Sequence, residues 1–257
     1  MGSKSKRLNQ IIALLKKNET MSVKNLSDML HVSEMTIRRD LNILEADDII
    51  IRSHGKATYK ADSDSDLSDY ELYSEKTKMN IEKDRIGQFA AGLIEPGDIV
   101  IIDNGSTTDK LTKYIPEDIS ITVLCYNFNV LEQLVKKQNV EIIFAGGYFH
   151  PNDQMFESPQ GIRLIENIRA TKLFISAHGV HKKLGLTCAN SYEVPTKHAI
   201  LQSAENRILV ADSSKFGKVR TAYFAQLNEI DTIVTDSAIT PEWRKFIEDI
   251  GIRLFVV

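Results

Sequence analysis

Short apolar runs alternate with helical patterns through the second part of this chain, and this alternation constrains the fold more than any other feature. The first run, Ile99–Ile102, is continuously apolar, which is typical of a strand buried on both faces of a parallel sheet. Strands that alternate with helices predict an α/β domain with a mainly parallel sheet. The expected strands cover residues 99–102, 121–124, 141–144, 173–176, 208–211, 233–235 and 253–256, and the expected helices cover 81–93, 107–114, 129–137, 161–168, 194–204 and 241–250.

A different pattern occupies the N-terminal part of the chain. Apolar residues follow i, i+3, i+4, i+7 from Leu8 and i, i+3, i+7 from Val23, which predicts two short amphipathic helices. A third helix is expected to begin after Ser33, a residue that suits the N-cap position. The β-rich run 49–59, interrupted by a turn at Gly55, is expected to form a two-stranded wing. Together these elements predict a winged helix-turn-helix domain.

The third helix carries two adjacent arginines, Arg38 and Arg39, away from an apolar face that contains Ile37 and Leu41. Taken alone, such a pair of charges is usually a solvated helix face. In a three-helix unit followed by a basic wing, the pair instead favours a helix that reads double-stranded DNA. The residues expected to contact DNA are Ser33, Glu34, Met35, Thr36, Arg38, Arg39, Asn42, Arg52, His54 and Lys56.

Composition and charge limit the classes of partner. The 257 residues, 42 % of them hydrophobic, can bury the cores of one small and one medium domain. The net charge of −3 is unevenly distributed, because residues 1–60 carry 11 Lys and Arg against 7 Asp and Glu, whereas the remainder is acidic. This distribution fits a protein that touches DNA through one module only.

The sequence also constrains the compartment and the domain bounds. No bilayer-spanning run or signal peptide is visible, so a cytoplasmic protein without membrane contact is expected. Cys125 and Cys188 lie far apart without CxxC spacing, which indicates neither zinc nor a disulfide framework and favours buried or half-buried thiols. A Ser- and Asp-rich acidic linker is expected over 61–75, between a DNA-binding domain at 1–60 and a second domain at 76–257.

Polar, glycine-rich turns follow the predicted strands, at the edge of the sheet where α/β proteins bind ligands. The turn 103–108, Asp-Asn-Gly-Ser-Thr-Thr, leads into a helix whose N-terminus attracts anions. It lacks the GxxxxGK[ST] and GxGxxG patterns, so it favours a single phosphate, and no cofactor or metal ion is expected. Lys215 could add a positive charge to that phosphate, while several polar side chains could bind sugar hydroxyls. The residues expected to contact this ligand are Asp103, Asn104, Gly105, Ser106, Thr107, Thr108, Tyr126, Asn127, Gly147, His178, Glu193, Lys197 and Lys215.

Each of these signals also has a simpler interpretation. A Gly-Ser-Thr-Thr turn can merely cap a helix, a single histidine such as His178 can be structural, and Asp212 can form a salt bridge at its strand end. Glu193 and Lys197, at i, i+4, can be a helix-surface pair or a pair that orients the ligand. Their common placement at strand ends favours phosphate binding.

At these residues the sequence resembles the DeoR family of bacterial transcriptional repressors over nearly its whole length. Residues 32–41 look like the recognition helix of that family, and residues 52–55 look like its wing, where Lys56 stands in place of a usual second glycine. The turn 103–108 matches the family's D-x-G-[ST]-T phosphate loop. Residues 212–217 match a motif that lies further along the sequences of this family. Several stretches, such as 193–198, are closer to the branch that governs deoxyribose catabolism.

The resemblance implies a sequence-specific repressor of a sugar or deoxyribonucleoside catabolic operon, relieved by a phosphorylated sugar with 2-deoxyribose 5-phosphate as the leading candidate. It implies an effector domain over 76–257 that is similar in fold to ribose-5-phosphate isomerase. A homo-oligomer is expected, because paired DNA half-sites need paired helices. Three alternatives stay open: an activator that senses a different sugar phosphate, an isomerase-like enzyme, and a scaffold whose acidic body binds another protein. The enzyme is not favoured, because no tight acidic cluster is visible and His178 stands where much of the family has aspartate.

Overall fold

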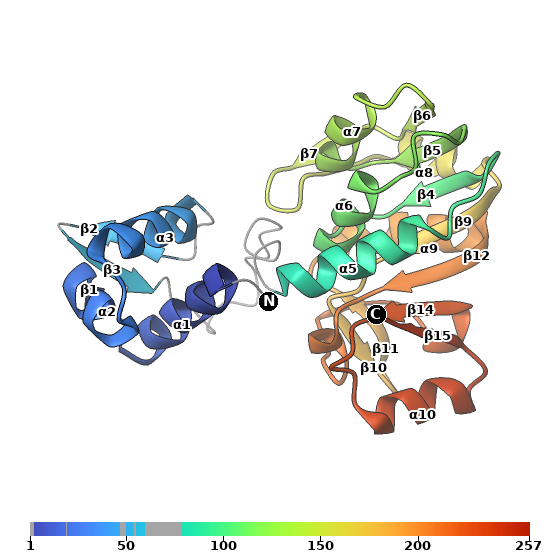
Figure 1. Cartoon of the computed structure of the whole chain (residues 1–257). Helices are drawn as coiled ribbons and strands as arrows, with labels where there is room; N and C mark the ends of the chain where they lie inside the picture. The colour runs from blue at the N-terminus through green and yellow to red at the C-terminus, as the bar shows by residue number, and fades with distance from the viewer. Residues whose placement is uncertain (1–2, 19, 47–49, 54, 60–78) are drawn as a thin grey trace. The chain divides into compact units, whose positions relative to one another are not determined.

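The computed structural model describes residues 3–18, 20–46, 50–53, 55–59 and 79–257. The chain divides into two compact units, Met1–Asp66 and Leu67–Val257 (Figure 1). The linker expected over 61–75 and the candidate His54 lie outside the described residues, so the expected domain bounds stay a prediction. No helix in the described part of the chain is long and apolar enough to cross a membrane.

The first unit is a winged helix-turn-helix, as predicted. Its helices are α1 (Ser3–Asn18), α2 (Val23–Leu30) and α3 (Glu34–Ala46), and its strands are β1 (Thr20–Ser22), β2 (Ile50–Ser53) and β3 (Lys56–Tyr59). Ile11 of α1, Leu26 of α2, and Ile37 and Leu41 of α3 meet in one buried core. The sheet order is β1-β3-β2, so the expected two-stranded wing gains a third strand. A strand of only three residues gives no periodic signal, which is why the sequence did not predict it.

The second unit is built on a seven-stranded sheet in the order β15-β14-β12-β9-β4-β5-β6. Every neighbouring pair in it is parallel, which confirms the predicted α/β class. The strands are β4 (Ile99–Ile102), β5 (Ile121–Cys125), β6 (Val140–Phe144), β9 (Ala170–Ile175), β12 (Ala204–Val210), β14 (Thr232–Thr235) and β15 (Arg253–Val256). The helices are α5 (Asn80–Ala91), α6 (Ser106–Lys113), α7 (Phe128–Leu134), α8 (Pro159–Glu166), α9 (Val194–Ser203) and α10 (Pro241–Asp249).

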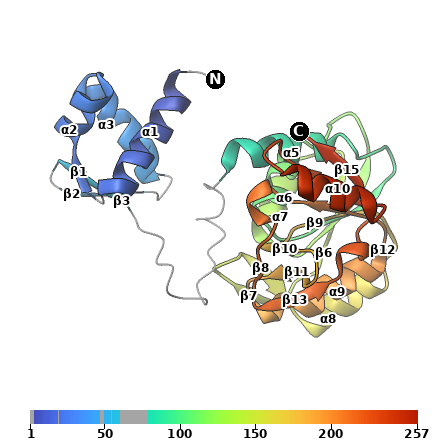
Figure 2. The same ribbon diagram turned by 90° about the horizontal axis from the view of Figure 1, so that it is seen from below.

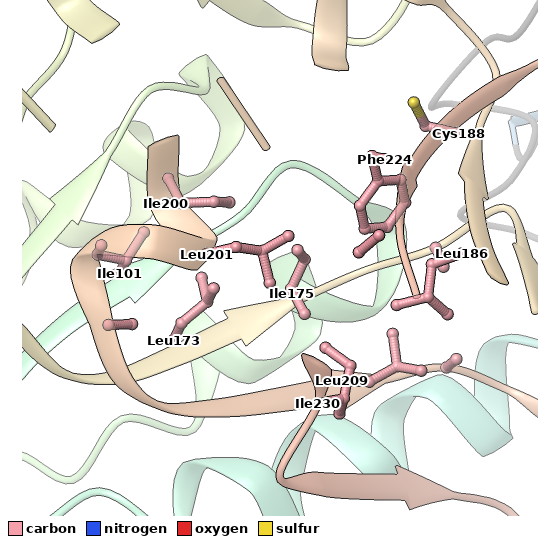
Figure 3. Close-up of a cluster of buried hydrophobic side chains, with 14 of the residues drawn as sticks. Ile101, Leu173, Ile175, Leu186, Cys188, Ile200, Leu201, Leu209, Phe224 and Ile230 are labelled. Carbon is pink, nitrogen blue, oxygen red and sulfur yellow. The ribbon is translucent and has the colours of Figure 1, made fainter. Parts of the chain in front are cut away.

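Side chains on successive strand positions enter two separate cores, one on each face of the sheet. Val100 and Ile102 of β4 belong to the core that also contains residues of α5, α6 and α7, whereas Ile101 between them belongs to the core that contains residues of α8, α9 and α10. Figure 2 shows α5 and the pair α8 and α9 on opposite sides of the sheet. In Figure 3, Leu173 and Ile175 of β9 meet Ile200 and Leu201 of α9 in the second of these cores. Burial on both faces explains the continuous apolar runs in the sequence.

Short antiparallel elements complete the second unit, and the sequence did not predict them. They are a hairpin of β7 (Tyr148–His150) and β8 (Met155–Glu157) and a small sheet of β10 (Gly179–His181), β11 (Gly185–Cys188) and β13 (Ala222–Ala225). Three 3₁₀ turns also occur, η1 (Ser191–Glu193), η2 (Ser213–Lys215) and η3 (Leu227–Glu229). Cys125 and Cys188 are buried free thiols, as predicted.

Candidate functional site

The candidate effector site lies where the strand order of the large sheet reverses. From β4 the chain proceeds outward through β5 and β6, then returns to the other side of β4 to form β9, β12, β14 and β15. The loops that leave β4 and β9 therefore diverge and open a crevice at the carboxyl ends of these two strands. These loops carry residues 103–105 and 176–178.

A small pocket is found at this reversal. Its walls come from the end of β9 and the following residues, the end of β12, the first turn of α6, and η2. The lining residues are Gly105, Ser106, Thr107, Ser176, Ala177, His178, Val210, Ala211 and Lys215. Five of them, Gly105, Ser106, Thr107, His178 and Lys215, are predicted ligand residues from three segments distant in sequence. A wider depression lined by Asn206, Asp231 and Arg253, among others, lies at the amino ends of the strands and contains no predicted site residue.

The first turn of α6 supplies the anion-binding geometry of this pocket. Gly105 precedes the helix, and a Cβ atom at this position would lie 2.5 Å from Ser176 Oγ, so only glycine permits this approach to β9. Thr108 does not face outward as a donor, because its hydroxyl donates to the Gly105 carbonyl at 2.8 Å. Ser106 and Thr107 remain at the pocket wall, beside the positive end of the helix dipole.

Asp103 is fully buried behind the pocket and is held by protein donors. Its Oδ2 accepts hydrogen bonds from Ser176 N at 2.8 Å and from Lys197 Nζ at 2.6 Å. Its Oδ1 accepts a short hydrogen bond from the Tyr126 hydroxyl, and its backbone carbonyl accepts one from Asn127 Nδ2 at 3.2 Å. This network ties β4 to β5, β9 and α9 and sets the position of the loop that follows β4.

Glu193 is the second buried acid near this network, with 1 % of its surface exposed. Its Oε1 accepts a hydrogen bond from Asn190 N at 3.0 Å, while its Oε2 has no hydrogen-bond partner among the described residues. Burial raises the pKa of Glu193 to about 7, although the positive charge of Lys197 opposes the shift. Burial acts to lower the pKa of Lys197, but the charges of Asp103 and Glu193 prevail and raise it, so this lysine is charged at neutral pH.

Buried polar atoms without a described partner mark further places where a ligand could bond. Among them are both amide atoms of Asn104, Oδ1 of Asn127 and Oε2 of Glu193. Such atoms are costly to bury unless a water molecule or a ligand satisfies them. Gly147 is not among the pocket-lining residues, and a Cβ there would lie 2.3 Å from the Glu157 carbonyl, so this glycine permits the turn into β7.

Ser176 is a polar residue of the pocket wall that the sequence did not single out as a ligand contact. It donates through its hydroxyl to the Asn104 carbonyl at 2.5 Å and to Asp103 Oδ2 at 3.1 Å. Its position at the end of a predicted strand was a signal that could have found it. Asp212 forms a salt bridge, a simpler interpretation that the sequence left open, and its partner is the buried Lys83 at 3.8 Å, which is distant in the sequence.

The candidate DNA interface is the outward face of α3. Ser33 caps this helix by accepting a hydrogen bond from Thr36 N at 3.2 Å, so its oxygen is engaged. Met35 is 66 % exposed. Arg38 and Arg39 are also exposed, and Arg38 lies 3.4 Å from Glu34 on the same helix. Among the described residues no ion pair is found for Arg39, which makes it the best-placed cation of this face.

Contacts between elements fix this helix in the first unit. On its inner side, Arg7 Nε of α1 bonds the buried Asp40 at 2.5 Å, a partner that the sequence did not predict. On its outer side, Arg52 of β2 donates a short hydrogen bond to Asn42 and lies 3.4 Å from Glu45. The predicted DNA contacts Arg52 and Asn42 are therefore adjacent. Lys56, at the start of β3, is exposed.

Comparison with known proteins matches both units to family models. Residues 7–62 match the model described as a DeoR-like helix-turn-helix domain, and residues 78–237 match the DeoR C terminal sensor domain. The deoxyribose operon repressor of Escherichia coli K12 is 33 % identical over 251 residues, which is 98 % of each chain. The HTH-type transcriptional regulator GolR of Listeria innocua is 32 % identical over 247 residues, which is 96 % of each chain.

A search of solved structures finds ribose 5-phosphate isomerase A of Methanocaldococcus jannaschii, with a TM-score of 0.41 and 12 % identity. The match covers 54 % of this chain and 55 % of the isomerase. At this level of similarity the match carries no conclusion about activity.

Proposed function

This chain belongs to the DeoR family of transcriptional repressors, and from that premise we propose that it binds operator DNA until a phosphorylated sugar fills the pocket of its second unit. The relatives reported above are named as transcription regulators, so the chain is a DNA-binding regulator rather than an enzyme. The operon of the Escherichia coli relative is named for deoxyribose, which makes 2-deoxyribose 5-phosphate the leading candidate for the effector.

One observation carries the proposal: the first turn of α6, His178 and Lys215 line a single pocket. We assign the phosphate to Ser106 and Thr107, whose hydroxyls and backbone N–H groups lie at the positive end of α6. The charge of Lys215, which lines the same pocket, complements the phosphate. A single dianion suits this arrangement because the turn has no motif for a longer phosphate chain.

The sugar hydroxyls are assigned to the polar side chains around the phosphate. Asn104 and Glu193 bury polar atoms that have no described partner, and sugar hydroxyls can both donate to and accept from such atoms. His178 lines the pocket and is the third candidate for a hydroxyl contact. Asp103 and Lys197, which form their own buried ion pair at 2.6 Å, are assigned to holding the loop that follows β4.

On the DNA side we assign base contacts to Met35, Thr36 and Arg39, with Arg38, Arg52 and Lys56 holding phosphates. Arginine reads guanine edges in the major groove and also binds phosphate oxygens. A homo-oligomer follows from the size of one winged helix, because one such module buries too little surface for tight operator binding. Effector binding then needs to change the free energy of operator binding by about 1–3 kcal/mol.

A thermal-shift measurement tests the phosphate assignment. 2-Deoxyribose 5-phosphate should stabilise the wild-type protein by about 2.7 kcal/mol at about 100 times its Kd. The double variant Ser106→Ala, Thr107→Ala should lose this stabilisation and keep its affinity for DNA.

Thr112→Val is the matched control, because Thr112 lies in the same helix away from the pocket and its hydroxyl donates to the Thr108 carbonyl. The control should respond to the ligand as the wild type does. A ligand-induced shift that survives in the Ser106 and Thr107 variant would remove this turn from the phosphate site.

A further inference from the structure

Helix α5 is the first helix that the structure describes in the second unit, and the chain reaches it from the DNA-binding unit. It packs along α6, whose first turn forms the wall of the effector pocket (Figure 1). The two helices approach closely at Gly87, where a Cβ atom would lie 2.7 Å from Leu111 N. Helix α5 is therefore in close contact with the helix that forms one wall of the pocket.

A buried ion pair joins α5 to a second wall of the same pocket. Lys83 of α5 lies with its Nζ 3.8 Å from Asp212 Oδ2, and both side chains are 0 % exposed. Asp212 begins the turn η2, where its Oδ1 accepts a hydrogen bond from Ser214 N at 3.1 Å. The next residue of that turn, Lys215, lines the pocket. Lys83 thus contacts the base of the turn that carries the pocket's lysine.

We propose that Lys83 and Asp212 are positioning residues that transmit effector binding from η2 to α5 and so to the DNA-binding unit. The proposal rests on the function proposed above. A dianion bound beside Lys215 attracts this lysine and displaces η2, and Asp212 moves because it caps that turn. Lys83 follows Asp212, because separating two buried charges is far more costly than moving them together.

In the described structure the two charges are not at their closest approach. At 3.8 Å the two charges are in ion-pair contact but beyond the range of a normal hydrogen bond. A displacement of less than 1 Å would bring Nζ and Oδ2 to about 2.8 Å and convert the contact into a charge-assisted hydrogen bond. The proposal therefore gives the pair two arrangements: the contact at 3.8 Å and a closed hydrogen bond in the ligand-bound protein.

The test separates effector binding from its consequence for DNA. The variant Lys83→Met, Asp212→Asn removes both charges at once, and asparagine keeps an oxygen that can accept from Ser214 N. Two quantities are measured: the thermal shift with 2-deoxyribose 5-phosphate, and the Kd for a fluorescent duplex selected by the wild-type protein from a random library. The wild type should lose about 5- to 100-fold in operator affinity when the sugar phosphate is added.

We expect the double variant to keep its thermal shift and its operator affinity without ligand, but to lose less than about 2-fold in affinity when the ligand is added. Lys113→Met is the matched control, because it removes an exposed pair between α6 and α5 that also measures 3.8 Å, Lys113 Nζ to Asp84 Oδ1. The control should respond as the wild type does.

A double variant that binds the ligand and releases DNA like the wild type overturns the role of the pair in transmission. A double variant that no longer binds the ligand also overturns it, since the pair would then act in binding. If the wild type itself shows neither a thermal shift nor DNA release, the proposed function is wrong and the inference falls with it.

Discussion

The Asp103 carboxylate joins the segments that form the effector site, and its hydrogen-bond partners lie far away in the sequence. The Tyr126, Ser176 and Lys197 groups that bond its carboxylate lie 23, 73 and 94 positions away. The sequence could place Asp103 at a strand end, and therefore near a ligand. It could not show that protein donors already occupy both carboxylate oxygens, because that depends on which strands become neighbours.

Glu193 carries a prediction about how the stability of the fold depends on pH. Its folded-state pKa of about 7 lies above the ordinary 4.5, so the folded protein holds a proton that the unfolded chain releases between these values. The stability from this proton is complete at low pH and is lost as the pH rises through about 7. We expect Glu193→Gln, which stays neutral, to be more stable than wild type by about 1–3 kcal/mol at about pH 8, with little difference below about pH 5.

Urea unfolding at several pH values measures this difference. Glu229→Gln is the matched control, because Glu229 also accepts the N-cap N–H of a capping box, from Gln226 at 2.6 Å, but is exposed to solvent. Its pH dependence should follow the wild type. Parallel pH profiles for Glu193→Gln and wild type would show that the carboxyl stays ionised in the folded state.

At the scale of elements, the sequence predicted the helices and strands that have a regular pattern of apolar residues, and it missed the short antiparallel strands. The helices around Ile11, Leu26 and Ile37, and all seven parallel strands, follow from apolar spacing and from burial on one or both faces. The strands β1, β7, β8, β10, β11 and β13 have three or four residues each, and their pairing depends on tertiary contacts. The Arg7–Asp40 pair was missed for a similar reason, since α1 and α3 are separated by 33 positions at this contact.

Helix α3 carries the prediction for DNA. Arg39→Ala should weaken binding to the selected duplex by about 1–3 kcal/mol, because the helix loses its best-placed cation while Ile37 and Leu41 keep its core. Fluorescence anisotropy gives the affinity, and circular dichroism checks the fold. Lys136→Ala, which removes an exposed lysine paired with Glu132 in the second unit, should leave the affinity unchanged. Equal affinities for the two variants would take Arg39 out of the interface.

At the scale of the whole molecule, the reversal of strand order explains why a sensor site forms where it does. The sequence indicated polar turns after several strands, but the strand order decided which of them meet. Among the described residues, those that line the pocket come from the turns after β4, β9 and β12, and Gly147 after β6 is not one of them. The family model spanning 78–237 covers all of these turns, which agrees with a sensor built on the sheet.

Release of operator DNA by a phosphorylated sugar is the most direct test of this account. Wild-type protein bound to its selected duplex is titrated with 2-deoxyribose 5-phosphate, and with free 2-deoxyribose and inorganic phosphate as controls. We predict that the sugar phosphate lowers operator affinity by about 5- to 100-fold and that neither control does so at the same concentration. An operator affinity that stays constant with saturating 2-deoxyribose 5-phosphate and with a panel of other pentose and hexose phosphates would contradict the account.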